Sequence, residues 1–256
     1  MKKKRIIGTS LLVVLCMLFV WGCKSIKDSN GPETLGELAY DENKQYGYTV
    51  YLKENSEYVP YLVLTSDYNG QVLLLREELL EESRVINEDN YGYAGYYKDS
   101  SMDRFINEEF LMYLEPEIQE AIVDSEITIT SKESLGITGT ETENIVRKVF
   151  LLSYTELAHP SSSVVNKEGE PLKYFENTEN RIAYRAGEPA SWWLRSSETW
   201  EAYTTCAIDR KGVWGHMSVD KKCGVRPAFC LSNTLLIEQS GDVLEGQVVY
   251  VVKKSQ

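Results

Sequence analysis

Tryptophans that could bind a ligand gather in the C-terminal half of the chain, at positions 192, 193, 200 and 214. An indole ring can stack on a sugar ring or on a partner's side chain, and it can equally anchor a core. Successive side chains of a strand point to opposite faces. Of Trp192 and Trp193, one is therefore predicted to enter the core and the other to face a loop layer or solvent, with the core favoured for both. Trp200 and Trp214 flank a predicted hairpin and are predicted ligand-binding residues, with burial in the core as the alternative.

A second aromatic cluster lies in the Asn/Gly/Tyr-rich segment 90–97 (NYGYAGYY). Loops rich in tyrosine and glycine form adaptable recognition surfaces, because the rings supply contact area and the glycines supply freedom of the backbone. We therefore predict that Tyr93, Tyr96 and Tyr97 contact a ligand. The alternative is a loop whose tyrosines lie flat against the strands.

Three arginines, Arg104, Arg195 and Arg226, lie within or beside apolar segments. An unpaired guanidinium buried there would lose its hydration, so each should have a partner. Asp103, Glu156 and the backbone carbonyls of long loops are candidates. We favour the interpretation that the arginines pin loops to the fold. Arg195 is also a candidate for an anion-binding pocket that suits a carboxylate, and it is kept among the ligand-binding residues.

Catalytic signatures do not accompany these groups. His159 and His216 are the only histidines, and neither belongs to a recognisable nucleophile elbow or triad. The spacing of Cys206, Cys223 and Cys230 matches no common zinc pattern, and both one disulfide with a free thiol and three buried thiols are open. We therefore predict no catalytic residue, no metal and no cofactor. A binding module is favoured, with a cell-envelope enzyme of unrecognised mechanism or a structural assembly domain as alternatives.

Residues 1–22 are typical of an export signal. Basic residues at positions 2–5 precede an apolar run from Ile6 to Val20 that is short for a membrane span, which needs about 20 apolar residues. The run ends in Val-Trp-Gly-Cys23, which resembles the bacterial lipobox and implies lipidation of Cys23. We expect a lipoprotein anchored by acyl chains at the extracytoplasmic face of a bacterial cell membrane. An uncleaved N-terminal anchor, or cleavage elsewhere, is the alternative.

The remainder is predicted to consist of a tether and one domain. Residues 23–45 are polar without periodicity, which indicates a lipidated N-terminus and flexible tether, and residues 46–256 form the globular domain. The formal net charge is −12 and becomes more negative once the basic leader is removed. Such a surface repels a phosphate backbone, which excludes nucleic acid as a general partner. An extracellular glycan or an extracellular protein is the expected ligand.

Short strands dominate the predicted domain, with a few helices and long loops, which is typical of an α+β fold of mixed and antiparallel strands. Met102, Phe105, Ile106 and Phe110 recur at helical spacing and predict a helix over 101–114. A second helix is predicted over 116–123, a capping box at 153–156, and loops at 131–144 and 158–180. Strands are predicted at 48–52, 58–65, 71–76, 126–130, 146–152, 192–194, 202–208, 213–217, 225–231 and 247–252.

Four motifs occur in a fixed order: SSMDRFIN at 100–107, VFLLS at 149–153, WWLRS at 192–196 and GVRPA at 224–228. In combination they resemble a bacterial family catalogued as domain of unknown function 6273, over about residues 61–231. The closing pattern of a Trp-rich strand, a hairpin and an Arg-containing strand is also similar to the C-type-lectin-like and formylglycine-generating-enzyme folds. The family implies no established activity. It implies structural roles for Arg104, Asn107, Trp192, Trp193, Arg226 and Pro227.

Overall fold

The computed structural model describes residues 31–44, 47–160, 162–244 and 247–253. The predicted leader, residues 1–22, and the predicted lipidation site Cys23 lie outside the described residues. Pro32–Gln256 forms one compact unit, and this unit is described below. Within the described ranges no helix has the length and apolar character needed to cross a membrane.

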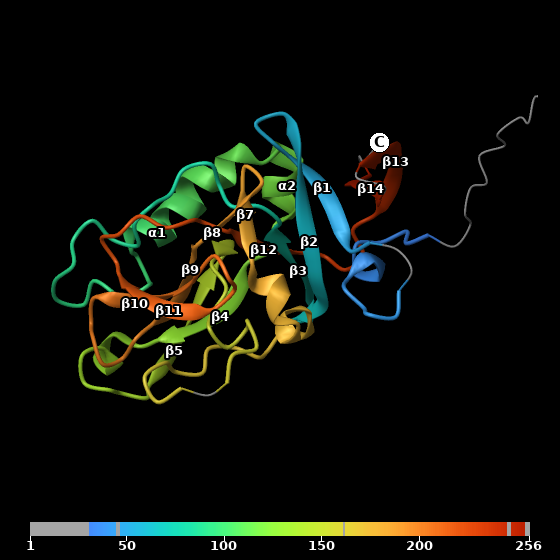
Figure 1. Cartoon of the computed structure of the whole chain (residues 1–256). Coiled ribbons are helices and arrows are strands. Elements are labelled where there is room, and N and C mark those ends of the chain that lie inside the picture. The colour runs from blue at the N-terminus through green and yellow to red at the C-terminus, as the bar shows by residue number, and fades with distance from the viewer. Residues whose placement is uncertain (1–30, 45–46, 161, 245–246, 254–256) are drawn as a thin grey trace, which may run out of the picture. The chain divides into compact units, whose positions relative to one another are not determined.

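The largest element is a seven-stranded mixed sheet in the order β13-β14-β1-β2-β3-β12-β6. Strands β1, β2 and β3 form an antiparallel meander, and β14 pairs with β1 in parallel although the two lie far apart in the sequence (Figure 1). The Asn69-Gly70 turn has positive φ at both residues, as a tight hairpin needs. The strands are β1 Thr49–Glu54, β2 Glu57–Tyr68, β3 Gln71–Arg76, β6 Val149–Phe150, β12 Ala228–Leu231, β13 Ile237–Leu244 and β14 Gln247–Val252.

The described residues also form three smaller antiparallel sheets. One sheet has the order β11-β10-β9, with β9 Trp192–Ser197, β10 Thr204–Ile208 and β11 Trp214–Ser218. The second pairs β4 Ser125–Thr130 with β5 Thr142–Arg147, and the third pairs β7 Ala183–Arg185 with β8 Glu188–Ala190. The mixed content of strands, helices and long loops confirms the predicted α+β class. The predicted loop 131–144 ends early, because β5 begins at Thr142 and pairs with Thr130.

The predicted helix over 101–114 forms as one continuous helical segment whose pitch changes along its length. It begins as α1 Ser101–Arg104, widens to a π-helix, Phe105–Glu109, and tightens to a 3-10 turn, Phe110–Tyr113. The Ser100 hydroxyl caps it by accepting a 3.1 Å hydrogen bond from the Asp103 amide. The second helix, α2, spans Pro116–Ala121. Short 3-10 turns occur at Gly36–Leu38, Lys132–Ser134, Lys173–Glu176 and Thr178–Arg181.

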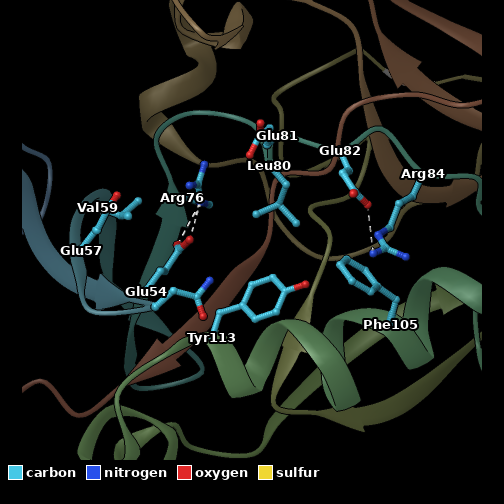
Figure 2. A pocket seen from close by; sticks show the side chains of 11 residues that line it. Glu54, Glu57, Val59, Arg76, Leu80, Glu81, Glu82, Arg84, Phe105 and Tyr113 are labelled. Carbon is cyan, nitrogen blue, oxygen red and sulfur yellow. Dashed lines mark hydrogen bonds and ion pairs between the residues drawn. The ribbon is translucent and has the colours of Figure 1, made fainter.

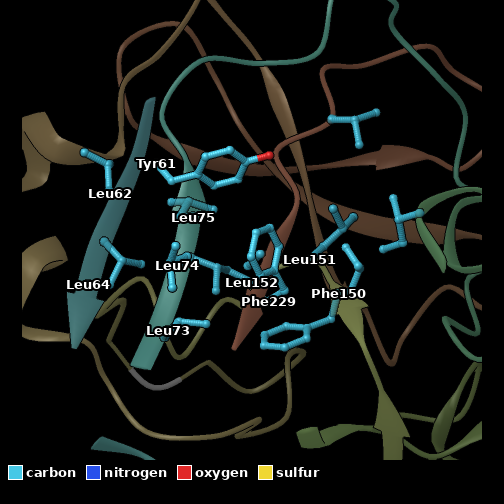
Figure 3. Close-up of a cluster of buried hydrophobic side chains, with 14 of the residues drawn as sticks. Tyr61, Leu62, Leu64, Leu73, Leu74, Leu75, Phe150, Leu151, Leu152 and Phe229 are labelled. Atoms are coloured by element: carbon cyan, nitrogen blue, oxygen red, sulfur yellow. The ribbon is translucent and has the colours of Figure 1, made fainter. Parts of the chain in front are cut away.

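The main core packs against the faces of β2, β3, β12 and β6, which are neighbouring strands of the seven-stranded sheet (Figure 3). Consecutive residues of β3 are buried on both faces of the sheet, which explains its unbroken apolar sequence. Fully burying one such side chain stabilises the fold by about 1.5–3 kcal/mol. The side chains in view include Tyr61, Leu62, Leu73, Leu74, Leu75, Phe150, Leu151 and Phe229.

The structure corrects the predicted tether between residues 32 and 40. Leu35 and Leu38 are fully buried, and the Leu35 amide donates to the Leu235 carbonyl at 2.8 Å. The Tyr40 ring packs edge-on against Tyr48 and Tyr174, at centroid distances of 5.0 and 5.2 Å. These few apolar groups cover the sheet, so the packed part begins near Pro32 rather than at residue 46. The prediction was wrong because the polar residues between them conceal the apolar contacts.

Candidate binding site

The segment between β3 and α1 forms a hollow of about 560 Å³, which we call the tyrosine hollow. The Tyr91 and Tyr93 rings line it and are 72% and 52% exposed. The Lys132 ammonium lies 5.4 Å from the centre of the Tyr93 ring. The hollow is lined by Asn87, Glu88, Asp89, Tyr91, Gly92, Tyr93, Ala94, Tyr96, Lys98, Asp99, Ser100, Ser101, Arg104 and Lys132.

Backbone contacts hold the tyrosine segment in place. The Gly95 amide donates to the Ala202 carbonyl at 2.7 Å, and the Ser197 hydroxyl donates to the Gly95 carbonyl. A Cβ at Gly95 would lie 2.9 Å from the Thr204 carbonyl oxygen, so a larger residue does not fit. The Asn87 side chain spans the base of the loop, donating to the Ala94 carbonyl and accepting from the Ser101 amide. The exposed rings therefore sit on a fixed backbone.

The other two tyrosines of the segment face inward to different degrees. Tyr96 is partly buried and lines the hollow, and its hydroxyl donates to Glu143. Burial first, and then the neighbouring Glu143 carboxylate, raise the pKa of Tyr96. Tyr97 is only 1% exposed, and its hydroxyl accepts from the Leu151 amide at 3.2 Å. Burial therefore removes Tyr97 from the predicted ligand contacts: its ring belongs to the core.

Charged groups of both signs ring the hollow. The Tyr91 hydroxyl donates to Asp89 at 3.3 Å, and Lys98 lies 3.9 Å from Glu143. The exposed Arg104 donates to the Asp99 carbonyl at 2.9 Å and so lies at the rim. Carboxylate, ammonium and guanidinium groups thus stand beside exposed ring faces, an arrangement suited to a polar ligand with flat apolar patches.

The structure does not place the predicted tryptophans in this hollow. Trp200 is 61% exposed on the loop that joins β9 to β10, and this loop contacts the tyrosine segment through the Gly95–Ala202 hydrogen bond. Trp214 is half-buried and packs edge-on against Tyr154, with ring centres 5.0 Å apart. Trp200 is therefore a neighbour of the hollow, whereas Trp214 belongs to a different cluster.

Arg195 forms a buried ion pair instead of an exposed anion site. Its guanidinium donates to both Glu156 oxygens, at 2.7 and 2.8 Å, and to the Thr128 and Leu151 carbonyls. Neither charged side chain is exposed, and a second carboxylate, Glu168, lies 3.9 Å away. Burial alone lowers the pKa of the Arg195 guanidinium, but Glu156, together with Tyr68 and Glu168, more than offsets this and raises it. The prediction that Arg195 binds a ligand is wrong because its guanidinium is buried and paired, and its contacts fit the loop-pinning interpretation.

The WWLRS strand contributes two buried indoles. Trp192 and Trp193 are both fully buried, so neither faces solvent. The Trp192 ring nitrogen donates to the Arg181 carbonyl at 3.0 Å, and that of Trp193 donates to the Arg84 carbonyl at 2.8 Å. Both rings thus fasten irregular loops to the sheet while filling the core.

The GVRPA segment leads into β12, so the predicted strand 225–231 begins only at Ala228, and the segment fixes a loop in a similar way. Arg226 is buried, donates to the Arg76 and Glu77 carbonyls at 2.9 Å, and lies 5.1 Å from the Trp192 ring. Burial lowers the pKa of Arg226 to about 10. The carbonyl of Pro227 accepts from the Arg76 amide at 3.0 Å.

Asn107 links the helical segment to the main sheet. Its side chain donates to the Val149 carbonyl at 2.9 Å and accepts from the Val149 amide at 3.0 Å. This pair of bonds replaces a missing neighbour at the edge strand β6, so Asn107 closes the ladder. The contacts fit the structural role that the motif implied.

In the described part of the chain, Cys206, Cys223 and Cys230 are buried free thiols. Burial raises the pKa of Cys223 to about 11 and that of Cys230 to about 12, which keeps both protonated. Among the described residues no three Cys, His, Asp or Glu side chains gather closely enough to hold a metal ion.

Two further hollows involve residues that the sequence analysis did not single out. The first holds Glu54 paired with Arg76 at 2.9 Å and Arg84 stacked 3.6 Å above the Phe105 ring (Figure 2). The second, of about 500 Å³, is a groove lined by five tyrosines: Tyr48, Tyr51, Tyr58, Tyr174 and Tyr184. These tyrosines come from distant segments, so only the order of the strands brings them together. The only sequence signal that could have indicated this groove was the large number of tyrosines in the chain, 17.

Comparison with known proteins fixes the family. The family described as domain of unknown function (DUF6273) matches residues 69–233, more than half of the chain. The chain belongs to this family. The matched region includes the tyrosine hollow, the Arg195 ion pair, the WWLRS strand and the GVRPA segment, and it confirms the resemblance read from the motifs. No curated protein and no solved structure matches the chain. The similarity to C-type-lectin-like and formylglycine-generating-enzyme folds therefore stays a prediction.

Proposed function

We propose that this DUF6273 protein is a lipid-anchored surface protein that binds an extracellular glycan in its tyrosine hollow. The observation that carries the proposal is the pair of exposed rings, Tyr91 and Tyr93, fixed above a hollow with polar walls. An aromatic face stacks on the C–H face of a sugar, while nearby carboxylates and amides bind its hydroxyl groups.

The dimensions of the hollow favour a glycan over a protein. Its volume of about 560 Å³ lies within the range of small-ligand sites, roughly 300–1,000 Å³, and holds one or two sugar rings. A stable protein interface buries about 800 Å² on each partner around an apolar centre. Two tyrosine rings surrounded by charged groups supply no such centre. Binding of a protein at this site is therefore the alternative that the experiment below must distinguish from glycan binding.

The anchor is proposed from the sequence. A basic start, an apolar run and Cys23 in a lipobox-like motif support lipidation of that cysteine and attachment to the extracytoplasmic face of a bacterial membrane. Labelled palmitate should enter the wild-type protein and not a Cys23→Ala variant. Equal labelling of both would exclude the anchor.

The binding proposal is tested with the full chain in detergent micelles on a glycan array. The expected result is binding to a defined set of glycans that is lost in Tyr91→Ala and Tyr93→Ala variants. Tyr58→Ala is the matched control, because its ring is 55% exposed at a different hollow. A pull-down from the cell envelope runs in parallel. Capture of one protein, lost in the same two variants and without glycan binding, would replace the glycan with a protein ligand.

A further inference from the structure

The groove of about 500 Å³ that five tyrosines line, which we call the sheet groove, lies on one face of the main sheet. Thr49 and Tyr51 of β1 pair directly with Leu62 and Pro60 of β2, and directly opposite residues share a face of the sheet. All four line the groove, whereas the residues that alternate with them are buried in the core. The same face continues to Tyr58, whose ring is 55% exposed.

Distant segments supply the walls of the sheet groove. The Tyr174 ring, from the 3-10 turn Lys173–Glu176, meets the Tyr48 ring with centres 5.5 Å apart and an angle of 69° between the planes. Tyr184, on β7, is 43% exposed. Its carbonyl accepts from the Leu79 amide at 2.8 Å, which fixes β7 beside the segment that follows β3. Aromatic rings from four segments therefore surround one hollow on a fixed backbone.

The charged groups among the described lining residues are two carboxylates, those of Glu77 and Glu78. The Glu78 side chain is exposed and forms no ion pair within the described residues. Arg76 holds the backbone of Glu78 by donating to its carbonyl at 2.7 Å, while the Arg76 charge is paired with Glu54 at 2.9 Å. The buried Arg226 offsets part of the Glu77 charge from the protein interior. Glu78 therefore leaves the groove negative.

We propose that the sheet groove binds a free organic cation that carries a trimethylammonium group. The face of an aromatic ring attracts a cation, and several rings together suit a group whose charge is spread over its methyl groups. Those methyl groups need no hydrogen bonds and remove apolar ring surface from water. A primary ammonium is strongly hydrated and would lose that hydration between the rings. The Glu78 carboxylate adds attraction for the positive charge.

One ring of the groove already has a cation beside it. The Lys53 ammonium lies 5.1 Å from the centre of the Tyr58 ring and pairs with Glu115 at 3.2 Å. The proposed contacts are therefore with the other rings, of which Tyr184 is largely accessible. The proposal is independent of glycan binding, because the sheet groove shares no lining residue with the tyrosine hollow.

Choline is the probe, titrated into the full chain in micelles of a non-ionic detergent at constant salt and followed by proton NMR. Its N-methyl signal should move upfield and the shift should saturate, because the methyl groups lie over ring faces. A dissociation constant in the millimolar range, roughly, suits so small a ligand. The neutral 3,3-dimethyl-1-butanol has the same shape and should bind at least about tenfold more weakly.

Two further ligands test the chemical class. Phosphocholine represents the headgroup of a lipid or polymer and should bind more weakly than choline, because its phosphate is repelled by the carboxylates of the groove. Arginine represents the side chain of a protein partner and should also bind more weakly. Tighter binding of phosphocholine than of choline would assign the site to a headgroup, and tighter binding of arginine to a protein; either result would overturn the proposal.

Matched variants locate the binding. Tyr184→Leu and Glu78→Gln should each weaken choline binding by about two- to fivefold, and both change exposed side chains. Tyr91→Ala, at the tyrosine hollow, and Glu81→Gln, an exposed glutamate outside the groove, should bind choline as the wild type does. If a groove variant fails to fold, the wild-type comparison of choline with dimethylbutanol decides alone. No saturable shift, equal binding of these two ligands, or unchanged binding in either folded groove variant would overturn the proposal.

Discussion

Replacing Arg195 with methionine should strongly destabilise the fold. Methionine fills a similar volume but cannot donate to Glu156 or to the Thr128 and Leu151 carbonyls. Glu156 keeps two donors, the Tyr68 hydroxyl at 2.6 Å and the Ser153 amide at 2.8 Å, but its charge remains buried. Breaking a buried ion pair from one side costs about 3–5 kcal/mol. We expect Arg195→Met to lower the free energy of unfolding by about 4 kcal/mol at pH 7.

The second carboxylate makes this loss depend on pH. Burial raises the pKa of Glu168, and the Arg195 charge partly opposes that rise. Without Arg195 the pKa of Glu168 in the folded protein rises further. An acid with a raised pKa in the folded state contributes stability below its unfolded pKa and loses it as the pH increases. The destabilisation should therefore be larger at pH 8 than at pH 5.

Urea unfolding followed by tryptophan fluorescence measures these effects, because Trp192 and Trp193 are buried in the folded state. The double variant Arg195→Met/Glu156→Gln removes both charges and should recover about half of the loss. Arg104→Met, at an exposed arginine, should change stability by less than about 0.5 kcal/mol. A loss below about 1 kcal/mol for Arg195→Met, or a double variant no more stable than the single one, would refute the reasoning. Arg195→Lys that folds normally but loses a ligand would restore the pocket interpretation.

Three further predictions follow, two tested by the same urea unfolding and one by the reactivity of the thiols. Gly95→Ala should destabilise the fold by roughly 1–3 kcal/mol, because the added Cβ meets the Thr204 and Ala202 carbonyls at 2.9 and 3.0 Å; unchanged stability would show that the loop yields. The stability of Glu168→Gln relative to the wild type should increase as the pH rises. The wild-type protein loses stability when the Glu168 carboxyl, whose pKa is raised in the folded state, ionises, and the glutamine cannot ionise. A difference in unfolding free energy that does not change with pH would contradict this. The three thiols should react with a disulfide reagent only after unfolding, and rapid reaction of native protein would contradict their burial.

Local patterns predicted those elements whose side chains repeat regularly. The strand 71–76 and the final strand 247–252 form with the predicted bounds, and the helical segment ends within one residue of its prediction. Each has an apolar run or an apolar face that the core requires. In contrast, β13 was missed because seven of its eight residues are exposed, so no buried face marks its sequence. The short strands β7 and β8 have only three residues each and leave too little pattern to detect.

The candidate site was predictable only in part, for a physical reason. Tyr93 and Tyr96 line the tyrosine hollow as the composition of their loop suggested. Whether a given tyrosine turns outward depends on contacts with distant segments, and the Leu151 amide holds Tyr97 inside. The capping box at Ser153 and Glu156 has its two reciprocal hydrogen bonds, but turns rather than a helix follow it, and Glu156 also pairs with Arg195. Long-range pairing therefore decided the roles that local spacing left open.

The most direct test of the glycan proposal is isothermal titration calorimetry. One oligosaccharide selected on the array is titrated into the wild-type protein and into a Tyr91→Ala/Tyr93→Ala double variant, and the two affinities are compared. The account predicts that the double variant folds as the wild type does, because both rings are largely exposed, and that it loses about 10-fold or more in affinity. Equal affinity of the two proteins for the same oligosaccharide would contradict it.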